Sequence, residues 1–554
     1  MISLKGGVFV RKKILSIILS LVLVALIVVP AFADEAKNNY NPVLIVTGIS
    51  EYAIVDGNGD NVFPLESDQT ASLVAKVAPS VAKYLVDKDS DALMDTLIPA
   101  FKDWLSPMAC NPDGSVTYPE THLKYQFRES VEEEGIENVG CTDALDKDIL
   151  QATVDAVGAD KVYVYGLDWR IDPMVIADEI NDYIQHIKQV TGYSKVSVAA
   201  ISMGGVMTSA YLAKYGYNDV SHVTMISSAF TGVDMVGQLF CKKVVLDETG
   251  AQRLINQLIS IKGVSKVIEM TGLLKKLVPL LSTLVDEQID RVYDEVLIPI
   301  FGYNPSIWSF VDDEVYEEAK ATMLAGADPS FEGVIDAYHY GVQVRAKEIL
   351  QNAKNAGVKI AIVSNYNLQI SPITDRSNYN ADTVIETRHT SGFATVALLG
   401  ETLGENYKQA KYTDKNYLSS DGVIDASTCY FPENTWFIKD MYHVGFDIES
   451  NNNDIYTWLM TADRQMDIHS NPLYPQFNIY EDDIKLLHPL DMVAGDVNHD
   501  GEANLVDVRI VLRASKSLTS IDDAVGFMLA DFDKDKEITE NDADLILNYV
   551  AGVK

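Results

Sequence analysis

Cysteine and basic residues are scarce in this sequence. Only 4 of its 554 residues are cysteine, and 44 lysine and arginine residues stand against 80 aspartate and glutamate residues, for a formal net charge of −36. So few cysteines exclude a disulfide-stapled small domain, and 47% hydrophobic residues with 33 glycines exclude a collagen-like or wholly disordered chain. A polyanionic surface repels phosphate backbones, so we expect no nucleic-acid partner. The length predicts a large domain accompanied by a smaller one.

Long apolar runs are also absent, with one exception near the N-terminus. Ile14 to Val29 is apolar, follows four basic residues, and is succeeded by Pro30 and the small-residue sequence Ala31-Phe32-Ala33. This arrangement predicts a secretory signal peptide over residues 1–33. A retained membrane anchor is the alternative, because the run is nearly long enough to span a bilayer. No later segment has 18 unbroken apolar residues, so we expect no transmembrane span after cleavage, and a secreted, extracellular or cell-surface protein.

Export would permit disulfide bonds among the four cysteines. Three pairings are possible, and the sequence does not choose among them. A bond between Cys110 and Cys141 would close a polar loop, and four free thiols are the alternative. The cysteines are Cys110, Cys141, Cys241 and Cys429.

Residues 34–490 alternate short β-branched segments with helical ones. This rhythm predicts an α/β domain in which crossover helices join the strands of a parallel-type sheet. Between residues 235 and 340 the strand rhythm stops and apolar residues recur at helical spacing. We therefore expect a helical cap inserted over one end of the sheet, with extra core helices as the alternative. The predicted strands are residues 42–46, 161–165, 195–199, 222–226, 359–363 and 435–438.

A candidate nucleophile lies where one predicted strand meets a helix. Ala200-Ile201-Ser202-Met203-Gly204-Gly205 places small residues two before and two after Ser202. Small residues at these positions let the chain turn sharply and project the serine hydroxyl, as in the G-x-S-x-G nucleophile elbow, with Ala200 in place of the first glycine. The alternative is that Ser202 only caps the following helix.

A serine hydroxyl needs a base to take its proton and a carboxylate to orient that base. In this architecture the chain order is serine, acid, histidine. We predict His443 as the base, because it follows a predicted strand in an apolar and glycine-containing loop, with His469 as the fallback. For the acid we predict Asp421, in a turn beside a glycine, with Asp382 as the runner-up.

An oxyanion hole requires two backbone N–H groups aimed where negative charge develops. One should be the N–H of Met203, the residue after the nucleophile. The second should come from Ile49 or Ser50, after the first strand, where Gly48 permits a tight backbone.

Several of these segments together resemble secreted α/β-hydrolase lipases, especially the lecithin–cholesterol acyltransferase and lysosomal phospholipase relatives. The segments are 43–50, 165–173, 196–205 and 420–429, together with His443. The resemblance implies an α/β-hydrolase core, an ester or acyl-lipid substrate, and a triad of Ser202, Asp421 and His443. The sequence departs from many lipases at Thr47, where those have histidine, and in its long stretch between residues 359 and 421.

Two loops near the C-terminus repeat the spacing of calcium ligands at an interval of about 35 residues. Oxygen-bearing residues occupy loop positions 1, 3, 5, 9 and 12, and position 7 offers a backbone carbonyl, which predicts two bound Ca²⁺ ions. Gly501 fills the sharp-turn position of the first loop, and Lys536 fills it in the second, where we expect strain. The predicted ligands are Asp496, Asn498, Asp500, Glu502, Asn504 and Asp507 in the first loop, and Asp531, Asp533, Asp535, Glu537, Thr539 and Asp542 in the second.

Residues 491–554, with two such loops each leading into a helix, resemble the small all-α type I dockerin domain of bacterial cellulosomes. The resemblance implies a cohesin module of a scaffoldin as partner and a place in polysaccharide breakdown. The alternative is a solvated acidic tail.

The function these features favour is a secreted serine hydrolase that cleaves carboxylic esters, in particular lipid acyl esters, and that is attached to a complex by its C-terminal domain. No cofactor is expected for the reaction itself. Acyl transfer to an alcohol would use the same residues. An acetyl or feruloyl esterase of plant polysaccharide and a catalytically silent binding protein are the remaining alternatives.

Overall fold

The computed structural model describes residues 40–49, 51–64, 67–139, 145–247, 249–250, 287–443, 454–482 and 485–552. Its centre is an eight-stranded sheet of order β15-β14-β13-β8-β7-β6-β1-β5. Neighbouring strands are parallel except β14 and β15, which are antiparallel. The strands are β1 (Val43–Val46), β5 (Val162–Tyr165), β6 (Val196–Ile201), β7 (Val220–Ile226), β8 (Lys359–Tyr366), β13 (Thr435–Lys439), β14 (Phe477–Glu481) and β15 (Leu486–Pro489).

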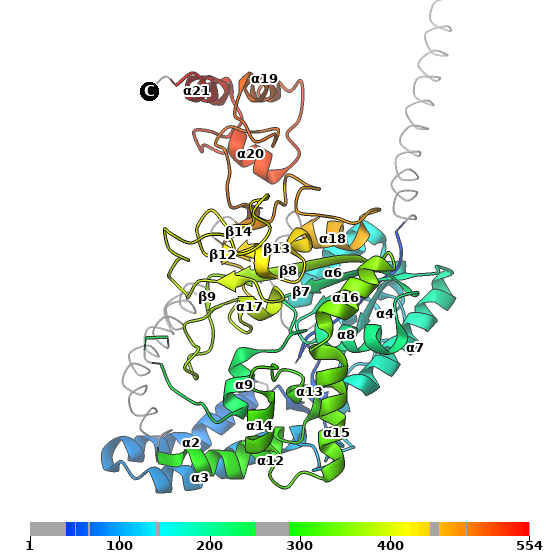
Figure 1. Cartoon of the computed structure of the whole chain (residues 1–554), viewed down its shortest axis with the longest axis vertical. Helices are drawn as coiled ribbons and strands as arrows, with labels where there is room; N and C mark the ends of the chain where they lie inside the picture. Colours follow the sequence, from blue (N-terminus) through cyan, green and yellow to red (C-terminus); the bar gives the residue numbers. More distant parts are fainter. Residues whose placement is uncertain are drawn as a thin grey trace, which may run out of the picture.

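The sheet confirms the α/β architecture and all six predicted strands. The inner strands are nearly continuous apolar runs because helices cover both of their faces, and every residue of β1, β5, β6 and β7 is buried. Helices α7 (Pro173–Thr191), α8 (Gly204–Tyr215) and α16 (Ala346–Asn355) pack together over one face. Helices α6 (Leu145–Val157) and α18 (Asp454–Thr461) lie together over the other (Figure 1). Strands β14 and β15 were not predicted.

The region between β7 and β8 is helical, as predicted, and its described residues contribute no strand to the central sheet. Its first helix, α9, begins directly beyond the carboxyl end of β7. The expected helices around 255–268 and 273–284 lie outside the described residues. The described elements are α9 (Asp234–Phe240), η3 (Tyr293–Leu297), α12 (Ile298–Phe301), α13 (Pro305–Trp308), α14 (Tyr316–Met323), α15 (Pro329–Tyr338) and η4 (His339–Gln343).

A helical hairpin from early in the chain joins this region. Helices α2 (Ser67–Asp87) and α3 (Ser90–Leu105) pack on each other, and α3 contacts η3, at the end of the molecule away from the C-terminal helices (Figure 1). Gln288 Nε2 donates to Asp91 at 2.9 Å, and Arg291 forms an ion pair with Asp95 at 3.0 Å. The helical region is therefore built from two distant parts of the sequence.

The C-terminal segment has a small core of its own. Its helices are α19 (Leu505–Ala514), α20 (Ala524–Ala530) and α21 (Glu540–Val550). They bury Val511, Leu529 and Ile546 in a cluster separate from the main core, and Leu486 of β15 contributes to it. Helix α20 contacts β15, and α19 and α21 lie on the side of α20 away from the sheet (Figure 1). The described helices after residue 490 thus share a core of their own, and their assignment as a separate domain stays a prediction.

Three of the four cysteines are buried free thiols. Cys110, Cys241 and Cys429 form no disulfide, and Cys141 lies outside the described residues. Burial raises the pKa of Cys241 and of Cys429 to about 11, which keeps both thiols protonated at neutral pH. The predicted signal peptide also lies outside the described residues. Among the residues that are described, no helix has both the length and the apolar composition required to cross a membrane.

A buried ion pair fixes the segment that follows β5. The Arg170 guanidinium donates to both carboxylate oxygens of Asp168, at 2.9 and 2.6 Å, and also to the carbonyls of Pro107 and Thr121. Arg170 is 1% exposed. Asp172 then caps α7, accepting from the N–H of Met174 at 2.8 Å. One side chain thus ties residues 107–121 to the carboxyl end of β5.

Replacement of Arg170 by alanine should lower the free energy of unfolding by about 3–5 kcal/mol, because it leaves a partly buried carboxylate and two carbonyls without their donor. Denaturant unfolding measures this. Arg345→Ala is the matched control, since its pair with Glu348 is about half exposed on both sides and its loss should not change stability measurably. Equal effects of the two substitutions would contradict this account.

Candidate active site

Ser202 lies in the sharp turn between β6 and α8. Its φ angle is +52°, in the left-handed region that a residue with a side chain rarely adopts. Its N–H donates to the carbonyl of Ile226 in β7, and its carbonyl accepts from the N–H of Ala229 at 3.0 Å. The strained conformation and the strand–turn–helix context are those of a nucleophile elbow.

Small residues around the turn are required by close backbone contacts. A Cβ on Gly204 would lie 2.1 Å from the carbonyl oxygen of Val46, and one on Gly205 would lie 1.4 Å from the Ser228 hydroxyl. A Cβ on Gly48 would approach the Cβ of Ser202 to 3.0 Å. The turn is therefore packed so closely against the ends of β1 and β7 that glycine is needed at the first two positions of α8, 204 and 205.

His443 lies against Ser202, as predicted. Its Nε2 is 2.9 Å from the Ser202 hydroxyl, and its Nδ1 is 2.8 Å from the Oδ2 of Asp382. Ser202 and His443 follow the carboxyl ends of β6 and β13, and Asp382 follows β10 (Asn380–Ala381), in the stretch of chain after β8. Ser202, His443 and Asp382 are 5%, 7% and 0% exposed, so the hydrogen bonds that join them are shielded from water.

The backbone holds the Asp382 carboxylate in place. Its second oxygen, Oδ1, accepts from the N–H groups of Val384 and Ile385, at 3.0 and 2.8 Å. The carboxylate is thereby turned so that Oδ2 faces the imidazole. With Nδ1–H donated to Asp382, Nε2 of the neutral ring is left to accept a proton from the serine.

The prediction that Asp421 is the acid is wrong, and the runner-up Asp382 has that position. Asp421 instead forms an ion pair with Lys439 at 2.9 Å and accepts from the hydroxyls of Tyr366 and Ser419, at 3.0 and 2.7 Å. Although burial opposes ionisation, the Ser419 hydroxyl and Lys439 outweigh it and hold the pKa of Asp421 below its usual value. Asp421 therefore fixes the ends of β8 and β13.

The loop that carries His443 is tied to the same edge of the sheet. Asn365, near the end of β8, donates to the carbonyl of Tyr442 at 2.8 Å and to the hydroxyl of Ser227 at 3.2 Å. The fallback histidine, His469, lies in an exposed turn where its backbone N–H donates to Asp467. It has no part in this arrangement.

Of the predicted oxyanion donors, Met203 and Ile49 are described and Ser50 is not. Among the described residues, neither the N–H of Met203 nor that of Ile49 has a hydrogen-bond acceptor. Both residues adjoin the turn, Met203 by sequence and Ile49 through the close approach of Gly48 to Ser202. Their assignment as an oxyanion hole stays a prediction.

The two C-terminal loops have the same conformation. The carboxylate at position 1 accepts from the N–H groups of positions 5 and 6, and the carboxylate at position 12 accepts from positions 2, 3 and 9. The residue at position 6 is left-handed in both, Gly501 at φ +93° and Lys536 at φ +72°. In the second loop, carboxylate oxygens of Asp531, Asp533 and Asp535 lie within 4.8 Å of one another.

No protein-family model matches this chain, and a comparison with curated proteins gives no significant match. The assignment of this site therefore depends on its own geometry.

Substitution of Asp382 by asparagine should lower kcat by about 10⁴-fold, because the amide cannot hold the imidazole in the tautomer that accepts the serine proton. Asp421→Asn should keep most of the activity and lower thermal stability, because it weakens the ion pair with Lys439. Steady-state kinetics on a chromogenic ester, with thermal melting of both variants, measures this. A larger kinetic loss in Asp421→Asn than in Asp382→Asn would contradict the assignment.

Proposed function

We propose that this protein is a serine hydrolase of the α/β-hydrolase type that cleaves carboxylic esters. The observation that carries the proposal is the continuous chain of hydrogen bonds from Ser202 through His443 to Asp382, with lengths of 2.9 and 2.8 Å. Two further observations support it. Ser202 lies at the end of a strand in a mainly parallel sheet, and its φ angle is left-handed, as in the nucleophile elbow of such enzymes.

In the proposed reaction, His443 Nε2 takes the hydroxyl proton of Ser202 as its oxygen attacks the ester carbonyl. Asp382 stabilises the imidazolium that forms. The backbone N–H groups of Met203 and Ile49 would donate to the oxyanion of the tetrahedral intermediate. His443 then gives its proton to the departing alkoxide, which leaves an acyl group on Ser202. Water, activated by the same histidine, releases the acid.

A lipid acyl ester is the proposed substrate class, on the strength of the resemblance to secreted lipases and acyltransferases. The helical region starting at α9 adjoins the carboxyl edge of the sheet, where Ser202 lies, and it is the part of the fold that would accommodate an acyl chain. Export, as the predicted signal peptide implies, agrees with an extracellular ester substrate.

We further propose that residues 491–554 form a calcium-dependent dockerin domain that attaches the enzyme to a cohesin. Asp531, Asp533 and Asp535 bring three negative charges together, and this arrangement is favourable when a cation lies between them. The first loop shares the same hydrogen-bond pattern, so Asp496, Asn498 and Asp500 would bind a second ion. The proposed ligand sets are completed by the side-chain oxygens of Asn504 and Thr539, the carboxylates of Asp507 and Asp542, and the carbonyls of Glu502 and Glu537.

A fluorophosphonate probe should label the wild-type protein and fail to label Ser202→Ala, since only an activated serine reacts with it. The variant should lose at least about 10³-fold in ester hydrolysis. Absence of labelling in the wild type would contradict the proposed hydrolase activity and favour a catalytically silent binding protein.

A series of p-nitrophenyl esters from acetate to palmitate tests the substrate class on the same two proteins. Activity that rises with chain length supports a lipid esterase, because each added methylene contributes about 0.8 kcal/mol when it is buried. Activity confined to acetate favours the polysaccharide esterase instead. Added alcohol that diverts product from acid to a new ester would show acyl transfer.

Removal of Ca²⁺ with EGTA should lower the melting temperature of the C-terminal domain in the full chain, because ion binding stabilises only the folded loops. Asp542→Asn should reduce this calcium effect, since Asp542 occupies position 12. Asp544→Asn, two residues later on the exposed side of α21, is the matched control and should respond as the wild type does. An EGTA-insensitive wild type would contradict the calcium assignment.

A further inference from the structure

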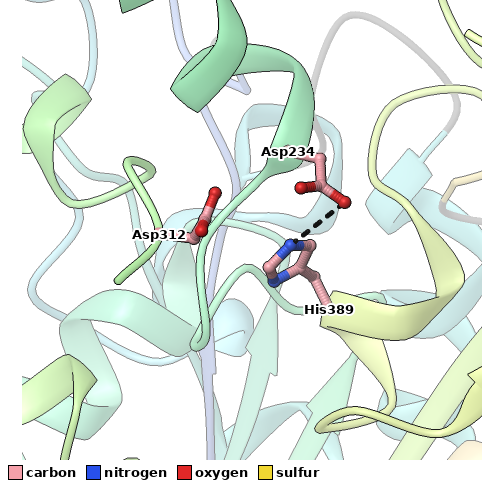
Figure 2. Close-up of side chains that lie close together, drawn as sticks. All are labelled: Asp234, Asp312 and His389. Carbon is pink, nitrogen blue, oxygen red and sulfur yellow. Dashed lines mark ion pairs between the residues drawn. The ribbon is translucent and has the colours of Figure 1, made fainter. Parts of the chain in front are cut away.

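A second cluster of titratable side chains lies outside the triad. It consists of Asp234 at the start of α9, Asp312 in the loop after α13, and His389 in α17 (Thr387–Thr390), and Figure 2 shows the three together. One ligand-type atom from each lies within 4.8 Å of the other two. Asp234 and His389 are 0% exposed and Asp312 is 2% exposed. The three residues come from segments that are far apart in the sequence.

Each of the three side chains has one atom without a hydrogen-bond partner among the described residues. These atoms are Asp234 Oδ2, Asp312 Oδ2 and His389 Nε2. A buried polar atom without a hydrogen-bond partner is unfavourable, and three at one place would be a considerable penalty. A ligand that all three could bind would remove it.

Thr231 determines which nitrogen of His389 is free. Its hydroxyl donates to the His389 carbonyl at 3.0 Å and lies 3.0 Å from His389 Nδ1. Because the hydroxyl hydrogen is used on the carbonyl, the oxygen accepts from Nδ1, which therefore carries the proton. In the neutral ring Nε2 then presents a lone pair. A hydrogen-bond acceptor on the far nitrogen is the usual arrangement for a histidine that binds a metal.

The two carboxylates are also oriented by fixed partners. Asp234 Oδ1 is paired with Arg376, and Asp312 Oδ1 accepts from the N–H of Glu314 at 2.9 Å. Two glycines make room for Asp312: a Cβ on Gly232 would lie 2.9 Å from the Asp312 Cβ, and one on Gly237 would lie 2.9 Å from its Oδ2. Each carboxylate thus uses Oδ1 for its close contact. Asp234 Oδ2 has only the longer ion pairs with His389 Nε2 and Arg388, at 3.5 and 3.6 Å, and Asp312 Oδ2 has no hydrogen-bond partner among the described residues.

The separation of two of these atoms is compatible with a metal bound between them. His389 Nε2 and Asp234 Oδ2 are 3.5 Å apart, whereas a charge-assisted N–H···O bond is about 2.7–2.9 Å long. Ligands of a tetrahedral Zn²⁺ at about 2.0–2.1 Å are separated by about 3.3 Å. One imidazole and two carboxylates are ligands that Zn²⁺ accepts, whereas Ca²⁺ takes six to eight oxygens.

From these observations we propose that Asp234, Asp312 and His389 bind a Zn²⁺-class divalent cation, with water completing the coordination. The surrounding charges permit it. Arg376 and Arg388 lie near Asp234, and Glu314 forms ion pairs with both arginines. The cation would join α17 to the start of α9 and to the loop after α13. This site is independent of the proposed esterase activity and of the C-terminal loops.

The test uses the full chain, stripped with a chelator and then returned to saturating Ca²⁺ so that the C-terminal loops do not vary. After incubation with Zn²⁺ and desalting, elemental analysis should find one zinc per chain, and thermal melting should show a higher transition temperature than in the zinc-free protein. Asp312→Asn and His389→Asn should both lose the bound zinc and the temperature shift.

His222→Asn is the matched control, because His222 is equally buried but both its ring nitrogens are partnered, by Ser221 at 3.0 Å and the Ala462 carbonyl at 2.8 Å. It should keep one zinc. Cobalt substitution gives a readout that does not need the variants, since Co²⁺ bound tetrahedrally to the wild type should produce strong visible absorption that Zn²⁺ abolishes. A wild type that retains no zinc and gives no such absorption would overturn the proposal, as would zinc retained by Asp312→Asn.

Discussion

The site depends on a turn that a serine adopts only under constraint. Ser202 has a φ of +52°, and a residue other than glycine in this region carries a strain of about 1–3 kcal/mol. The fold offsets that strain by packing: Gly204 lies against the carbonyl of Val46, and Gly205 against the side chain of Ser228. β6 is held in parallel register between β1 and β7, so its end cannot relax. Because neighbouring parallel strands finish at the same edge, the loops after β8 and β13 are brought to the same place as the serine.

Sequence patterns predict the features whose cause is local. β-branched runs predict six strands, and small residues at 200 and 204 predict the turn at Ser202. The sequence does not separate Asp421 from Asp382 as the acid, because the two have the same local structure. In each, a carboxylate oxygen accepts from the N–H two residues later, and apolar residues follow. What separates them is their partners, Lys439 for one and His443 for the other, at separations of 18 and 61 residues. The short distance from the end of β8 to Asp382 is the one sequence signal that favours it.

The two C-terminal loops illustrate the opposite case. Their ligand positions fall within twelve residues, so the residues needed for the loop are visible in sequence, and both copies adopt the same hydrogen bonds. Lys536 takes the same left-handed conformation as Gly501, which confirms that a side chain stands where glycine is favoured. The docking of α3 onto η3 and the residues before it had no such signal, because polar pairs such as Gln288 with Asp91 join residues 197 positions apart.

Asp382 and His389, one member of the proposed metal cluster, belong to one continuous segment. Glu386, four residues after Asp382, accepts from the N–H groups of Asp234 and Met235 at 3.0 Å, which attaches the acid loop to the start of α9. The segment before α9 contains Ala229, whose N–H donates to the carbonyl of Ser202. A change at the start of α9 can therefore reach the nucleophile and the acid through two short stretches of chain. A catalytic constellation needs such support from outside its own members, since the hydrogen bonds among three side chains do not by themselves fix the loops that carry them.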